Sequence, residues 1–162
     1  MKRLGFLLLL AQVLVACSFL GSPQAKQDGQ TPWWEDAVFY EIFVRSFYDS
    51  DGDGIGDFNG ITEKLDYVAD LGINAIWLMP IHPSPTYHGY DVINYYNVNP
   101  EYGSMEDFIH LLDEAHQRGM HIIIDLVLNH SSNRNPWFVD ANSNPASAYR
   151  DWYIWSEVDP GY

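Results

Sequence analysis

Apolar residues recur along residues 38–128 in two alternating patterns, one typical of strands and the other of helices. Residues 38–45 (VFYEIFVR) are rich in β-branched and aromatic side chains, which predicts a strand. The apolar spacing of residues 62–71 predicts a helix that stops at Gly72. Residues 75–79 (AIWLM) form a short apolar run, which predicts a second strand buried on both faces.

The same order of patterns then repeats. Ser104 is followed three residues later by Asp107, a capping pair that predicts the start of a helix, and Gly119 predicts its end. Residues 121–128 (HIIIDLVL) predict a third strand. Strands that alternate with helices favour an α/β fold with a parallel sheet and right-handed crossover connections.

Two parallel architectures fit this pattern, an open doubly wound sheet and a closed (β/α)8 barrel. No glycine-rich phosphate-binding turn follows any of the three predicted strands, which argues against a dinucleotide-binding sheet. A barrel needs eight strand-helix units and about 250 residues. Beyond residue 129 the sequence is irregular, with many Asn, Ser, Pro and Trp residues. If the fold is a barrel, we expect this chain to be its truncated N-terminal portion.

The first 32 residues are predicted to direct and tether the protein. Lys2 and Arg3 precede an apolar run over residues 4–15, which is too short to span a bilayer but suits a signal peptide. The run ends in LVAC and resembles a bacterial lipoprotein signal, so that residues 1–16 would be removed and Cys17 lipidated. The alternative is an ordinary signal peptide with an incidental cysteine. Residues 17–32 are rich in Ser, Gly, Gln and Pro and predict a flexible tether.

The charge balance restricts the partners of the chain. Eight Lys and Arg residues stand against 22 Asp and Glu residues, a formal net charge of −14. Nucleic acid is excluded as a partner, because a binder must neutralise phosphates with basic side chains. Anionic lipid headgroups would also repel so acidic a protein, so membrane attachment would depend on the acyl chain at Cys17. We therefore expect a lipid-anchored protein of the cell envelope or an extracytoplasmic surface.

An acidic loop follows the first predicted strand. In residues 49–57 (DSDGDGIGD) carboxylates recur at every second position, and glycines between them let the backbone curl around a hard cation. Four carboxylates this close would repel one another without a cation. The loop is not an EF-hand, because its twelfth position is Gly60 instead of a bidentate Glu. We predict a calcium site, with magnesium less favoured and a solvated Asp-Gly turn as the alternative.

Polar residues also follow the second and third predicted strands, where the loops of a barrel build the active face. After the second strand, Tyr90 offers a ring for stacking and Asp91 a hydroxyl acceptor, although such a pair also occurs in ordinary turns. On the third strand, alternation would place Asp125 and Asn129 on one face, with His130 just past the end. Asp125 lies in an apolar run, so it needs hydrogen-bond partners, and a structural role suits it best.

Five stretches together resemble the α-amylase family, glycoside hydrolase family thirteen, from about residue 32 onward. They are VFYEIFVRSF, DSDGDGIGD, GINAIWLMPI, HGYDVINYYNVNPEYGS and IIIDLVLNHSS, in this order. The resemblance implies an eight-fold α/β barrel with an irregular domain B inserted after the third strand. Residues 33–130 would then hold the first three strands and two helices of the barrel, and residues 131–162 the start of domain B.

The resemblance also implies roles for individual residues. Tyr90 would stack on the sugar just before the scissile bond, His130 would hydrogen-bond the same sugar, and Asp91 would lie near its far hydroxyls or in a supporting ion pair. Asp125 would support the site without reacting. Oxygen ligands for Ca2+ would come from the loop after the first strand: Asp49, Asp51, Asp53, the carbonyl of Ile55, and Asp57. Asn129 on the third strand matches a calcium ligand of another branch of the family and is less favoured here.

The family hydrolyses α-glucosidic bonds with retention, using an aspartate nucleophile and a glutamic acid about 5–5.5 Å apart. These residues belong to later strands, so no catalytic residue is assigned in this chain, and alone it should be inactive. We favour an α-amylase acting on α-1,4-glucans such as starch. The alternatives are an oligo-1,6-glucosidase or an α-glucosidase. The stretch YRDWYIW favours this second group, whereas Asn94 argues against it, because the group commonly has Asp at that position. A non-catalytic sugar- or calcium-binding lipoprotein also stays open.

Overall fold

The computed structural model describes residues 31–158 of the chain. The chain divides into two compact units, residues 1–36 and residues 37–162. The predicted signal peptide, Cys17 and nearly all of the predicted tether lie outside the described residues. The described end of the first unit forms a turn, in which Trp33 and Trp34 meet edge to face with ring centroids 5.8 Å apart. Among the described residues, no helix has the length and apolar character needed to cross a bilayer.

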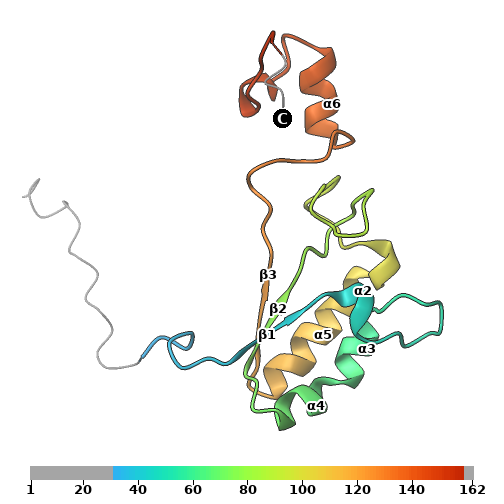
Figure 1. The fold of residues 1–162 in the computed structure, drawn as a ribbon, viewed down its shortest axis with the longest axis vertical. Coiled ribbons are helices and arrows are strands. Elements are labelled where there is room, and N and C mark those ends of the chain that lie inside the picture. Colours follow the sequence, from blue (N-terminus) through green and yellow to red (C-terminus); the bar gives the residue numbers. More distant parts are fainter. Residues whose placement is uncertain (1–30, 159–162) are drawn as a thin grey trace, which may run out of the picture. The chain divides into compact units, whose positions relative to one another are not determined.

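The second unit is built on a three-stranded parallel sheet. Its strands are β1 (Phe39–Ile42), β2 (Ala75–Leu78) and β3 (His121–Ile124), in the spatial order β1-β2-β3 (Figure 1). Each strand pairs with the next in parallel over four residues. The predicted α/β class and parallel sheet are therefore confirmed. Because the strands are parallel, their carboxyl ends lie at one edge of the sheet, and the following loops start there.

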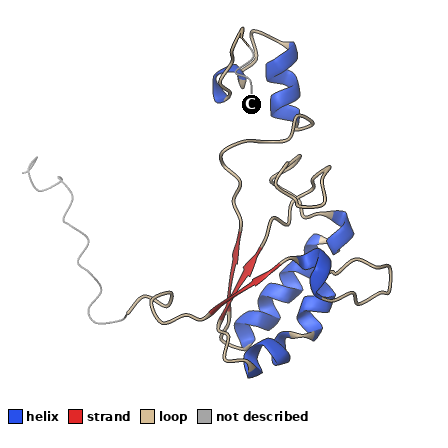
Figure 2. Ribbon diagram, in the orientation of Figure 1, coloured by secondary structure: helices blue, strands red, loops and turns tan. Residues whose placement is uncertain are grey.

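Helices connect the strands and pack against one face of the sheet (Figure 2). Two short helices, α3 (Phe58–Glu63) and α4 (Leu65–Asp70), lie between β1 and β2. The longer helix α5 (Met105–Gln117) lies between β2 and β3. Ser104 and Asp107 form the predicted capping box at its start, and Gly119 follows its end with φ 72°. This helix was therefore predicted correctly at both ends.

The sheet and these helices enclose an aliphatic core. Phe58 is fully buried and meets Tyr102 and Phe108 in edge and tilted contacts, with ring centroids 6.1 and 5.3 Å away. Burial of this apolar surface is the main stabilising term of the region. The core also holds buried side chains from the three connecting helices, from two strands and from the turn before β3: Ile42, Ile61, Leu65, Val68, Ile76, Leu78, Leu111, Ala115 and Met120.

The structure corrects the bounds of all three predicted strands, of which the second ends at Leu78 instead of Met79. The first ends at Ile42 instead of Arg45, because the chain turns into the short helix α2 (Val44–Phe47) and buries Val44. The third ends at Ile124 instead of Leu128, although the Asp125 N–H still donates to the Leu78 carbonyl at 3.1 Å. Residues 125–128 therefore do not belong to the regular strand on which the predicted alternation of side chains between two faces was based.

The predicted helix over residues 62–71 was also wrong in its bounds. It begins earlier, at Phe58, because the Asp57 side chain accepts the Gly60 N–H and caps the helix. It is then divided at Lys64, whose φ of −102° and ψ of 4° interrupt the helical backbone between α3 and α4.

The segment after β3 has its own short elements, α6 (Pro136–Ser143) and the 3-10 helix η2 (Arg150–Trp152). Another 3-10 helix, η1 (Pro100–Tyr102), lies before α5. The Ser132 N–H donates to the Val92 carbonyl at 3.0 Å, so this segment is tied to the loop after β2. The boundary of a domain B at residue 131 stays a prediction.

Candidate functional site

The loop after β2 folds back onto the end of its own strand. Gly89 has φ 82°, a left-handed conformation that favours glycine. A Cβ at Gly89 would lie 2.9 Å from the Pro80 carbonyl oxygen, so a side chain there would collide with the backbone. This close approach brings Tyr90 over the carboxyl edge of the sheet.

Tyr90 is held by Asp125, which follows β3. The Tyr90 hydroxyl donates to Asp125 Oδ2 at 2.7 Å, and the Trp77 Nε1–H donates to Asp125 Oδ1 at 2.8 Å. Hydrogen bonding to the Asp125 carboxylate, with burial, raises the pKa of Tyr90 to about 12. The prediction that Asp125 needs partners is thus confirmed. Since both oxygens of Asp125 are engaged, the carboxylate serves as a clamp that fixes the Tyr90 ring.

His88 lies near this ring, and Asp91 lies near His88. Thr86 Oγ1 donates to Asp91 Oδ2 at 3.0 Å, and His88 Nε2 lies 3.9 Å from the same oxygen. His88 Nδ1 accepts the Tyr90 N–H at 3.1 Å, and the two rings lie 6.0 Å apart. The Asp91 side chain is 37% exposed and a carboxylate accepts several hydrogen bonds, so it retains capacity for a ligand hydroxyl.

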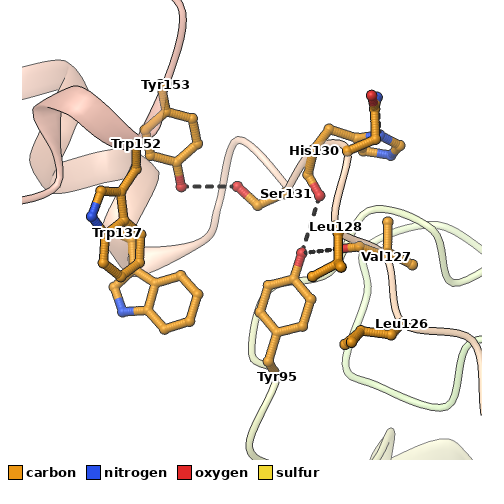
Figure 3. Close-up of a pocket in the computed structure, with 10 residues that line it drawn as sticks. Tyr95, Leu126, Val127, Leu128, His130, Ser131, Trp137, Trp152 and Tyr153 are labelled. Carbon is orange, nitrogen blue, oxygen red and sulfur yellow. Dashed lines mark hydrogen bonds between the residues drawn. The ribbon is translucent and has the colours of Figure 1, made fainter. Parts of the chain in front are cut away.

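His130 lies on the extended segment between β3 and α6, and its side chain is exposed. Its Nδ1 lies 3.2 Å from Asn129 Nδ2, so these two polar side chains of the segment are neighbours. A pocket of about 370 Å³ opens here (Figure 3). It is lined by the segment itself and by aromatic rings from the loop after β2 and from residues 137–153: Tyr95, Leu126, Val127, Leu128, Asn129, His130, Ser131, Trp137, Trp152 and Tyr153.

The acidic loop after β1 gathers three of its predicted ligands. Carboxylate oxygens of Asp49, Asp51 and Asp57 all lie within 4.8 Å of one another. Two ligands on opposite sides of a calcium ion lie roughly 5 Å apart, since each Ca–O distance is 2.3–2.6 Å. The donor set and its spacing therefore fit a hard cation. Asp53 is outside this cluster, and its Oδ1 accepts the Ile55 N–H at 2.7 Å.

The acidic loop owes its shape to hydrogen bonds within it. Asp49 accepts the Gly54 N–H at 2.8 Å and the Gly52 N–H at 2.7 Å, and these bonds lower the pKa of Asp49. Both glycines have positive φ, as the curled backbone requires. Asp57 is nearly buried, accepts hydrogen bonds from Ser50, and also caps α3. One aspartate therefore joins the loop to the helix that packs on the sheet.

Two residues of the site were missed by sequence analysis. Trp77 was counted only as part of an apolar strand, yet its indole N–H holds Asp125. Trp77 pairs in parallel with Ile123, so the two side chains lie on the same face of the sheet. Asp125 is two residues beyond Ile123 and lies on that face too, so the strand register could have predicted the contact. Tyr95 was missed because its partners are backbone carbonyls of a distant segment, which carry no sequence signal.

The family of the chain follows from comparison with known proteins. Residues 41–160 match the family described as "Alpha amylase, catalytic domain". The chain belongs to this family. This α-amylase family consists of glycoside hydrolases, and its barrel fold agrees with the three parallel strands and their connecting helices. The predicted identity as an N-terminal portion of a (β/α)8 barrel is therefore confirmed.

Individual members of the α-amylase family are similar to the chain over most of its length. Alpha-amylase 3 of Dictyoglomus thermophilum is 58% identical over 129 residues, which are 80% of this chain and 26% of that protein. A probable oligo-1,6-glucosidase 2 of Bacillus subtilis is 51% identical over 127 residues, 78% of this chain and 23% of that protein. The chain thus spans about a quarter of the length of the curated relatives it matches.

Solved structures of the α-amylase family agree with the fold. The crystal structure of an α-amylase from H. orenii has a TM-score of 0.72 and 60% sequence identity. The match covers 76% of this chain and 27% of that protein.

Proposed function

We propose that the intact protein hydrolyses α-1,4-glucosidic bonds of starch or maltodextrins with retention, and that this chain supplies part of its sugar-binding surface. The observation that carries the proposal is the Tyr90 ring, clamped by Asp125 next to Asp91. A ring that is fixed before the sugar arrives loses little freedom on binding, so stacking on it is effective. The residues that cleave the bond would come from later strands of the barrel.

The remaining polar groups suit a sugar. Asp91 keeps acceptor capacity for a hydroxyl pair, because Thr86 occupies only one of its oxygens. His130 is exposed at the rim of the pocket, where its ring can hydrogen-bond a second hydroxyl. Aromatic side chains line the far wall of that pocket, and they would contact the apolar faces of neighbouring sugar units.

A second candidate is hydrolysis of short α-1,6- or α-1,4-linked oligosaccharides, as in an oligo-1,6-glucosidase or α-glucosidase. It is supported by the similarity to an oligo-1,6-glucosidase. Asn94, which departs from the aspartate common in that group, accepts the Tyr96 N–H at 2.8 Å. Either an amide or a carboxylate can make this turn, so the departure at Asn94 does not argue strongly against the second candidate.

The decisive experiment compares Tyr90→Ala with Tyr90→Phe in the intact protein, assayed on maltooligosaccharides and on isomaltooligosaccharides. Loss of the ring in Tyr90→Ala should lower kcat/KM by about 10- to 100-fold. Tyr90→Phe keeps the ring but removes its hydrogen bond to Asp125, so kcat/KM should fall by a smaller factor. Tyr67→Ala, at an exposed site on α4, is the control. Hydrolysis of neither substrate by the wild type would refute the proposal, and a preference for isomaltooligosaccharides would favour the second candidate.

We further propose that the acidic loop binds Ca2+ through Asp49, Asp51 and Asp57, with Asp53 and the Ile55 carbonyl as additional ligands. When bound, the cation would neutralise the clustered carboxylates and stiffen the start of α3. The intact protein should therefore melt at a lower temperature after chelation and recover with added Ca2+. Asp51→Asn should abolish this response, whereas Asp113→Asn on the exposed side of α5 should not. A melting temperature that chelator leaves unchanged would contradict the proposal.

We also propose that the protein is held at the cell envelope or an extracytoplasmic surface by a lipid on Cys17. The support is the sequence of residues 1–17, with its basic start, apolar run and single cysteine. An enzyme in this position would act on glucans too large to be imported.

A further inference from the structure

Tyr95 lies between the loop after β2 and the extended segment that carries His130. Its hydroxyl is within hydrogen-bond distance of two carbonyl oxygens, 2.8 Å from that of Val127 and 3.0 Å from that of His130 (Figure 3). The single hydroxyl hydrogen is shared between the two acceptors. One side chain thus holds the backbone of this segment at both ends of a four-residue stretch.

The Tyr95 ring is itself held firmly. It stacks on Trp137 with ring centroids 5.7 Å apart and an interplanar angle of 7°. The ring of His82, which is nearly buried, lies 5.8 Å away in a tilted contact. His82 is fixed in turn by a contact of 2.9 Å between its Nδ1 and the Asn97 carbonyl. Packing of the ring therefore sets where the hydroxyl can reach.

The segment that Tyr95 holds is also fixed next to both its ends, where the Asp125 N–H donates to the Leu78 carbonyl and the Ser132 N–H donates to the Val92 carbonyl. Regular β3 pairing ends at Ile124, and beyond it Val127 is buried, whereas Leu126 and Leu128 are 61% and 80% exposed. Between these points, the two contacts of the Tyr95 hydroxyl fix the backbone carbonyls of Val127 and His130.

We propose that Tyr95 is a positioning residue, which places the His130 side chain for contact with the substrate by holding the backbone of residues 127–130. The part of this inference that concerns substrate rests on the proposed function. The Tyr95 hydroxyl is engaged by the two carbonyl oxygens, so Tyr95 acts on His130 through the backbone and its hydroxyl does not bond the sugar.

The kinetic test is a double-mutant cycle in the intact protein. Tyr95→Phe keeps the stacked ring and removes only the hydroxyl, and should lower kcat/KM about two- to tenfold, mostly by raising KM. In a His130→Ala background, Tyr95→Phe should have no further effect, because the side chain that it positions is gone. Additive losses would overturn the proposal. Tyr96→Phe, at the neighbouring and 78% exposed tyrosine, is the matched control and should leave kcat/KM unchanged.

A second measurement does not depend on activity. The imidazole C–H signals of His130, followed by NMR in the intact protein, should shift in Tyr95→Phe and stay in place in Tyr96→Phe. Unchanged His130 signals in Tyr95→Phe would overturn the proposal. If the signals move but no glucan is hydrolysed, the positioning role stands and the proposed function fails.

Discussion

Two regions of the second unit are stabilised in different ways. The sheet-and-helix region (residues 37–124) buries aliphatic side chains between a parallel sheet and its helices. In the aromatic segment (residues 131–158), Ala141 is the only buried hydrophobic residue among those described. Its rings instead meet one another near the surface, as when Phe138 contacts Tyr153 at 5.1 Å and Trp155 at 5.9 Å. The first region has a core, whereas the second has a cluster of half-exposed rings.

This difference matters because the candidate sugar site draws on both regions. Tyr90 and Asp91 belong to the sheet-and-helix region, and Asp125 follows its last strand. His130 lies just before the aromatic segment, and its backbone carbonyl accepts a hydrogen bond from Tyr95, whose ring stacks on Trp137. We infer that Tyr90 is positioned by Asp125 and Trp77, which lie on or next to the sheet, whereas His130 is positioned by contacts beyond the sheet.

The largest expected effect comes from the same substitution made once in each region. Phe58→Ala would open a cavity in the core and should lower the free energy of unfolding by about 3–5 kcal/mol. Phe138→Ala removes a half-exposed ring and should cost only about 1–2 kcal/mol, since less apolar area is lost. Chemical denaturation of the intact protein measures both values. Equal losses would contradict the distinction between a core and a surface cluster.

A smaller effect should appear as a difference in acid sensitivity between the helix caps of the two regions. At α5, hydrogen bonds from Ser104 to Asp107 lower the pKa of Asp107. The stabilisation that these bonds give the folded state is therefore fully present above the ordinary aspartate pKa near 3.9. It is lost as the pH falls through the lowered value, because the protonated carboxyl no longer accepts both bonds. At α6, the Asn135 side chain accepts the Trp137 N–H at 2.9 Å, and an amide does not titrate.

The measurement is the cost of each cap at pH 7 and at pH 3. Ser104→Ala and Asn135→Ala should each lower the free energy of unfolding by about 1 kcal/mol at pH 7. At pH 3 the cost of Ser104→Ala should shrink and that of Asn135→Ala should stay the same. If the two costs changed together with pH, the pKa of Asp107 would not be the cause.

Sequence pattern predicted the elements better than their ends. Helix α5 was predicted at both ends because its capping box and terminal glycine are local signals. The first strand was predicted too long because Val44 is as apolar as a strand residue, and only its burial in the turn at α2 distinguishes the two cases. The break at Lys64 likewise has no local marker, since lysine is common inside helices.

The sequence by itself determined the family, the parallel α/β pattern and the residue types that can bind a sugar or a cation, because motifs and periodicity are local properties of the chain. Only the tertiary structure decided that Trp77 and Tyr90 share Asp125, that Asp53 lies apart from the other loop carboxylates, and that Tyr95 holds the backbone at His130. These contacts join residues that are distant in sequence, or depend on exact backbone turns. Their geometry follows from packing, to which every part of the fold contributes.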